Sequence, residues 1–163
     1  MRSFAASVLF CFLAYVAGTA AAEEFTSYAI VRDDGALLIQ NRVVRLYGIY
    51  LPETGVNCRT KFSPAECGTR GALALEFKTA NQFVTCREVA ALSDGSINAT
   101  CWVEGPELGD YEDLAAYLIR QGWAVSVPGA PFEYTVLERI AEQQGVGVWG
   151  FQVGSVRFRH RPR

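Results

Sequence analysis

Apolar residues fall in blocks along the chain, and the blocks have three different spacings. Residues 3–17 are almost continuously apolar. From residue 25 onward, short runs rich in β-branched and aromatic residues alternate with Gly, Asp and Asn, a pattern typical of short strands and tight turns. Apolar residues three and four apart, the spacing of helices, occur in residues 69–81, 111–121 and 132–144. The chain is therefore expected to combine short strands with about three helices.

Five strands are expected, at residues 25–32, 36–39, 43–49, 82–89 and 97–103. Asp33-Asp34-Gly35 is a hairpin turn signal between the first two. Three strands, a helix, two strands and then helices form an α+β order. Such short strands close naturally into a five-stranded barrel with a helix at one end, which is the OB fold. A split open sheet is the alternative.

The segments between these elements carry further signals. Residues 50–69 contain repeated Pro and Gly and are expected to form a long loop. Asp110 is expected to cap the helix at 111–121. Residues 123–127 are expected to be extended, and residues 145–153 irregular.

The N-terminus has the features of a secretory signal. Arg2 precedes the apolar stretch, and Ala20-Ala21-Ala22 provides an A-x-A site, so cleavage is expected after Ala22. A membrane anchor is the alternative, but no basic stop-transfer flank follows the stretch. Cleavage leaves 163 − 22 = 141 residues, enough for one domain with a core. No membrane span is expected in this remainder.

Charge is unevenly distributed along the chain. Four of the 15 basic residues are the arginines at positions 157, 159, 161 and 163, and Arg2 lies in the signal. Residues 23–156 therefore have 15 − 5 = 10 basic and 17 acidic side chains, a net charge of −7. An acidic body repels phosphate backbones, so nucleic acid is an unfavourable partner. Residues 154–163 are expected to form a basic, flexible tail.

Four cysteines remain after cleavage, and an even count in an exported chain favours disulfides. If the hairpin of strands 82–89 and 97–103 is centred between Ser93 and Asp94, Cys86 faces Cys101. Cys58 and Cys67 would then pair within one loop. A zinc site is the alternative, but the chain has no C-x2-C spacing and only one His.

Residues 43–53, VVRLYGIYLPE, resemble the motif V-R-L-x-G-I-D-[TA]-P-E of the staphylococcal-nuclease-like, or thermonuclease, family. Residues 67–75 resemble the family's C-G-x-x-A-x-x-x-L helix entry. Residues 113–124 resemble its LVRxGWA helix end, and residues 138–149 its closing E-x-x-A-x-x-x-x-x-G-L-W motif. The resemblance extends from about Tyr28 to Trp149 and implies the OB barrel for residues 23–153.

Active members of this family hydrolyse DNA and RNA with bound Ca²⁺. That chemistry uses hard oxygen ligands for the ion, a carboxylate to activate water and arginines to neutralise the phosphoryl oxygens. By the resemblance, Arg45 stands at a phosphate-binding arginine and Glu53 at the water-activating glutamate.

The remaining catalytic positions are substituted. Tyr50 stands in place of one metal-binding Asp, and the other falls on Gly35 or Ala36, depending on the register. Ser96 stands where the second arginine is expected, and Leu51 replaces a neighbouring Thr. Affinity for a hard cation follows the charge of its ligands, and a transition-state arginine can supply about 10³–10⁵ of rate. No metal site is therefore expected.

The sequence thus predicts a periplasmic or secreted nuclease-like OB domain that is catalytically inactive and needs no cofactor. Its expected role is binding of an envelope protein or glycan, while Arg45 and Glu53 persist as a structural ion pair. Some exported members of the family are labelled as exopolysaccharide-biosynthesis proteins, which agrees with this role. The alternative is a weak or altered Ca²⁺-dependent endonuclease that uses Arg45 and Glu53.

Overall fold

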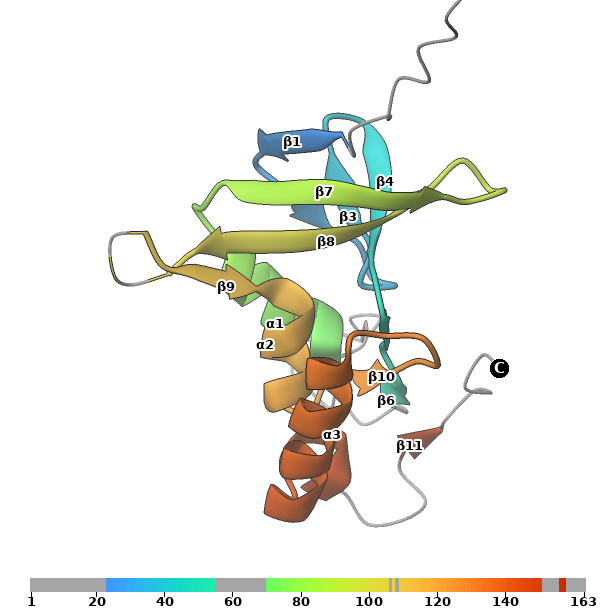
Figure 1. Cartoon of the computed structure of the whole chain (residues 1–163), viewed down its shortest axis with the longest axis vertical. Helices are drawn as coiled ribbons and strands as arrows, with labels where there is room; N and C mark the ends of the chain where they lie inside the picture. Colours follow the sequence, from blue (N-terminus) through green and yellow to red (C-terminus); the bar gives the residue numbers. More distant parts are fainter. Residues whose placement is uncertain (1–22, 55–69, 106, 108, 151–155, 158–163) are drawn as a thin grey trace, which may run out of the picture.

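A computed structural model describes residues 23–54, 70–105, 107, 109–150 and 156–157. The expectations for the signal at 1–22, for most of the 50–69 loop and for Cys58 and Cys67 lie outside these residues. In Figure 1 the main sheet occupies one end of the domain, and the helices lie together below it.

The main sheet is curled. Its strands are β1 (Glu24–Ser27), β2 (Ile30–Val31), β3 (Leu37–Ile39), β4 (Arg42–Leu46), β7 (Val84–Ala91), β8 (Ile97–Glu104) and β9 (Tyr111–Asp113). Their order is β1-β7-β8-β4-β3-β2, with β9 beside β8. Only Tyr28 and Ala29 separate β1 from β2, yet the two strands lie at opposite ends of this order. The sheet must therefore curl back on itself, which gives a half-barrel compatible with an OB-like fold.

More strands form than the five expected from the sequence. The expected strand at 25–32 is divided into β1 and β2, and β9 is additional. The expected strand at 43–49 ends at Leu46, and the chain resumes as β5 (Ile49–Tyr50), which pairs with β10 (Val125–Ser126). A second small ladder joins β6 (Glu53–Thr54) to β11 (Val156–Arg157). The α+β character is confirmed.

The described residues form three α-helices, α1 (Arg70–Thr79), α2 (Leu114–Arg120) and α3 (Phe132–Gln144), and a short 3-10 helix, η1 (Gly147–Gly150). The bounds of α3 match the expected ones. The expectation that Asp110 caps a helix beginning at residue 111 was wrong, because Tyr111–Asp113 pair with β8 as β9. Asp113 caps α2 instead, with its carboxylate accepting from the Ala116 N–H at 2.8 Å.

The core lies between the inner face of the sheet and the helices. Along β8, every second residue points inward and is buried, as a strand with one covered face requires. Leu114, Leu118 and Ile119 of α2 are fully buried against this face. On α3 the buried positions are Tyr134, Glu138 and Ala141.

Cys86 and Cys101 are direct partners in the antiparallel β7–β8 pair and form a disulfide, with their Cα atoms 4.1 Å apart. This pairing is confirmed. The register shifts between Glu88 and Ala90, so that Ala91 faces Ile97 and the turn is centred on Asp94. A bulge in β7 thus reconciles the turn with the cysteine register.

Candidate functional site

Arg45 links two turns that are far apart in the sequence. It lies on β4, beside Asn98 of β8. Its Nη1 is 3.4 Å from the Asp34 carboxylate in the β2–β3 turn, and its Nη2 is 3.8 Å from the Asp94 carboxylate in the β7–β8 turn. Arg32 also approaches Asp34, at 3.7 Å. We refer to Arg32, Asp34, Arg45 and Asp94 as the turn cluster.

Each aspartate of the turn cluster builds its own turn with one oxygen. Asp34 Oδ1 accepts from the Ala36 N–H at 3.1 Å. Asp94 Oδ1 accepts from the Ser96 N–H at 3.0 Å and from the Ser96 hydroxyl. The Oδ2 atom of each residue faces Arg45. Local turn chemistry therefore aims both carboxylates at one guanidinium.

These contacts favour the ionised form of Asp94. The Ser96 hydroxyl makes the largest contribution to holding the pKa of Asp94 below its usual value, followed by the Ser96 backbone N–H, and Arg45 adds a smaller one. The Arg45 side chain is 42% exposed and that of Asp94 is 56% exposed. The turn cluster is therefore a solvated ion network, and each pair contributes little to global stability.

The positions at which the resemblance expects other catalytic residues lie in different environments. Ala36 is 2% exposed and belongs to the core. A Cβ on Gly35 would lie 2.5 Å from Leu51 Cδ2, and a Cβ on Gly71 would lie 2.8 Å from the same atom. Ser96 is 4% exposed and holds the Asp94 turn.

A Ca²⁺ ion does not fit the described residues around Gly35. Calcium takes six to eight oxygen ligands, whereas the atom nearest to the Cβ position of Gly35, apart from residues 34–36, is a methyl carbon of Leu51. Among the described residues, no group of three or more His, Cys, Asp or Glu side chains is placed to hold a metal ion. Glu53 begins β6, but its side chain is not among the described parts, so its pairing with Arg45 stays a prediction.

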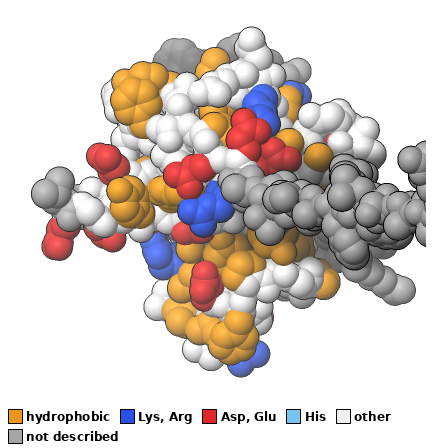
Figure 2. Space-filling view, turned by 45° about the horizontal axis from the view of Figure 1, so that its top comes forward, with side chains coloured by type: hydrophobic (Ala, Val, Ile, Leu, Met, Phe, Trp, Pro, Cys, Tyr) orange, Lys and Arg blue, Asp and Glu red, His pale blue; other side chains and the backbone are white. Residues whose placement is uncertain are grey.

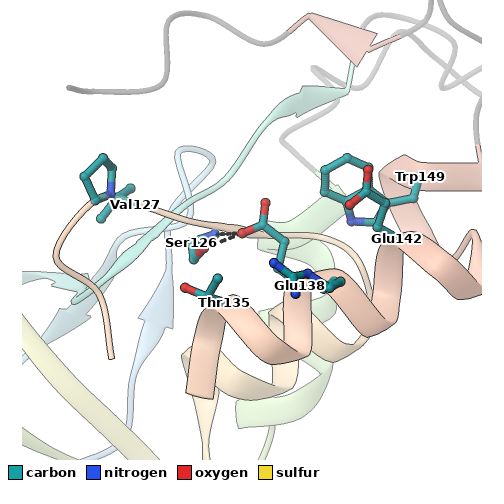
Figure 3. A pocket seen from close by; sticks show the side chains of 8 residues that line it. Ser126, Val127, Thr135, Glu138, Glu142 and Trp149 are labelled. Atoms are coloured by element: carbon teal, nitrogen blue, oxygen red, sulfur yellow. Dashed lines mark hydrogen bonds between the residues drawn. The ribbon is translucent and has the colours of Figure 1, made fainter. Parts of the chain in front are cut away.

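A pocket of about 490 Å³ lies on another part of the molecule, between α3, η1 and the segment that follows β10. In Figure 3, Val127 lies at one end and Trp149 at the other, with Ser126 and Glu138 between them. Glu138 is 8% exposed, and its carboxylate accepts from the Ser126 N–H at 3.0 Å and from the Ser126 hydroxyl.

The sequence interpretation assigned no site to this pocket. One signal was present, because Glu138 occupies a helical position between Tyr134 and Ala141 where an apolar side chain would be expected. Ser126 carried no such signal, because its partner lies twelve residues away on a different element.

The face shown in Figure 2 has acidic and basic side chains interspersed among hydrophobic ones. Within the described part of the chain, none of the helices has the length and apolar character needed to cross a membrane. No protein-family model matches the chain, and no curated protein is significantly similar to it.

Proposed function

We propose that this chain is an exported OB-type binding module built on a nuclease-like barrel, with a protein or glycan of the cell envelope as its partner. The curled sheet, the three helices and the four ordered motifs that resemble the thermonuclease family support this proposal. OB barrels bind oligonucleotides and oligosaccharides on one sheet face and in the adjoining loops. Asp34 and Asp94 of the turn cluster lie in turns of the sheet, and Arg45 lies on β4 between them.

The observation that carries the proposal is the position of Leu51, whose Cδ2 lies 2.5 Å from where a Cβ on Gly35 would be. In the resemblance, Leu51 replaces a threonine next to a metal-binding aspartate, and Gly35 or Ala36, depending on the register, replaces the other metal-binding aspartate. An apolar methyl group cannot coordinate a hard cation. The substituted side chains therefore offer Ca²⁺ fewer oxygen ligands, which supports binding without catalysis as the function of this barrel.

The state of Arg45 supports the same conclusion. A guanidinium that serves phosphoryl transfer has to meet the charge that develops on the phosphate. Here two carboxylates already face Arg45, at 3.4 and 3.8 Å. The two arginines and two aspartates of the turn cluster sum to zero charge, so the cluster offers a polyanion no net attraction.

Incubation of residues 23–163 with single-stranded DNA and Ca²⁺ tests the proposal. The expected result is no cleavage above a blank that contains a chelator, with a Ca²⁺-dependent nuclease as positive control. Ca²⁺-dependent cleavage that disappears in Arg45→Ala would contradict the proposal and establish the nuclease alternative. Size-exclusion chromatography and circular dichroism of both proteins show that each is folded.

A further inference from the structure

The pocket beside α3 has two chemically different walls. Val127, Pro128 and the Trp149 indole provide apolar surface. Thr135, Glu138, Arg139 and Glu142 provide polar groups from α3. These four positions are separated by three, one and three residues, which places them along one side of the helix. The polar wall therefore comes from one side of α3, and the apolar wall comes from the segments packed against it.

In the polar wall, Glu138 is held in one position, whereas the side chains on either side of it are exposed to solvent. Glu138 is 8% exposed, and two hydrogen bonds from Ser126 hold its carboxylate in place. Thr135, Arg139 and Glu142 are exposed. Among the described residues, neither Arg139 nor Glu142 forms a salt bridge.

The combination of hydrogen-bond donors, acceptors and charges in the polar wall limits which chemical class of ligand the pocket can bind. The wall contains two carboxylates that accept, one guanidinium that donates and hydroxyls that do both. An anion would meet two carboxylates, and a cation would meet Arg139. A neutral polyol suits this wall, because each hydroxyl both donates and accepts a hydrogen bond. The apolar wall suits the carbon face of a sugar ring, since an aromatic side chain offers a large, rigid contact area.

We infer that this pocket is a saccharide-binding site that takes a neutral sugar unit between Trp149 and the polar side of α3. Its volume of about 490 Å³ falls within the range of about 300–1,000 Å³ that is typical of small-molecule sites. The inference deepens the proposed function, because it names glycan as the partner class and places its site away from the turn cluster.

Titration of ¹⁵N-labelled residues 23–163 with cellotetraose and with maltotetraose tests the inference. The readout is the indole N–H signal of Trp149, assigned with Trp149→Phe, while Trp102 and Trp123 serve as internal references. We expect a saturable shift of the Trp149 signal with one or both sugars, with a Kd of about 0.1–10 mM. n-Butylammonium, a cationic probe, should cause no saturable shift.

Variants decide whether the shift reports this pocket. Thr135→Ala and Glu142→Ala change exposed residues, so both proteins should fold, and each should bind the sugar at least about tenfold more weakly. Gln143→Ala, an exposed neighbour on α3 that does not line the pocket, should bind as the parent does. Absence of a saturable shift up to about 20 mM sugar, unchanged affinity in both pocket variants, or tighter binding of n-butylammonium would each overturn the inference.

This experiment is independent of the DNA assay. Failure of the sugar titration without DNA cleavage would overturn the pocket assignment alone. Ca²⁺-dependent DNA cleavage would overturn the proposed function, whatever the sugar titration shows.

Discussion

The guanidinium of Arg45 on β4 lies 3.8 Å from the carboxylate of Asp94, which the β7–β8 turn carries to it. Asp94 is in turn held by Ser96, the residue that stands where the thermonuclease resemblance expects a second arginine. A position expected to add positive charge thus serves to orient a negative one. The outcome is an exposed guanidinium that faces two carboxylates from separate turns.

Removing the carboxylates of Asp34 and Asp94 should increase the affinity of Arg45 for phosphate. Asparagine at positions 34 and 94 keeps a carbonyl oxygen for the turn hydrogen bonds but no charge. We expect Asp34→Asn/Asp94→Asn to bind single-stranded DNA more tightly than the parent at low salt. The slope of log K against log salt should become steeper by about 0.7, the value for one phosphate contact. Fluorescence anisotropy of a labelled oligonucleotide at several salt concentrations measures both.

A matched control variant changes the net charge by the same amount at another place. Glu104→Gln/Glu107→Gln removes two exposed carboxylates that are not part of the turn cluster. An equal gain in this control would mean that net charge alone is responsible. Adding Arg45→Ala to the turn-cluster variant should abolish the gain.

The disulfide between Cys86 and Cys101 should be present in the purified protein and should stabilise it. The two cysteines are separated by 15 residues, and the loop-entropy model gives about 3 kcal/mol for a loop of this length. Urea unfolding of the parent and of Cys86→Ala/Cys101→Ala, both without a reductant, measures the difference. Peptide mapping under non-reducing conditions should recover the Cys86–Cys101 peptide and also the predicted Cys58–Cys67 peptide. Recovery of Cys58 linked to Cys86 would contradict both pairings.

The hairpin and α3 could be predicted from the sequence because each is defined by local signals. Inward positions along β8 recur with a period of two, so Cys101 necessarily shares a face with Ala99 and Val103. Gly145, with φ of 63°, ends α3 in the left-handed conformation that favours glycine.

The parts that sequence reasoning missed depend on distant partners. Tyr111–Asp113 have no strand pattern of their own and become β9 only because the end of β8 offers an unpaired edge. The contacts of Arg45 with Asp34 and Asp94 likewise follow from the closure of the sheet, which brings two turns together. The expected loss of the metal site was argued from missing carboxylates and stays a prediction, whereas the position of Leu51 beside Gly35 and Gly71 required the structure.

Tyr134 should make stability depend on pH in the alkaline range. It is 2% exposed and donates to Asp113 Oδ2 at 2.9 Å. Burial, and next the negative charge of Asp113, raise the pKa of Tyr134 well above its ordinary value of 10.0. The folded protein therefore retains this proton while the unfolded chain loses it, so the contribution of Tyr134 is complete below pH 10 and falls as the pH rises further.

Comparison with Tyr134→Phe isolates this contribution, because the other titrating groups are shared. At pH 8 the variant should be less stable by about 1–2 kcal/mol, since Asp113 loses a hydrogen-bond donor. Above pH 10 that difference should shrink by up to about 1.4 kcal/mol per pH unit. Urea unfolding at pH 8 and pH 11 measures it. A difference that stays constant between these pH values would contradict the raised pKa.

Gly122 should be far less replaceable than Gly95, although both have positive φ, of 71° and 80°. A Cβ on Gly95 would have nothing within 4 Å, whereas one on Gly122 would overlap the backbone carbonyl of Val146. Gly122 also accepts from the Val148 N–H at 2.9 Å, which joins the end of α2 to η1. The backbone on both sides is therefore fixed and cannot move away from an added methyl group.

Gly95→Ala should cost about 1–2 kcal/mol, the penalty for a left-handed alanine. Gly122→Ala should cost about 1–3 kcal/mol more, because the overlap adds to the same backbone penalty. Urea unfolding of the two variants gives this difference directly, and equal stabilities would show that the close contact between α2 and η1 does not constrain the fold.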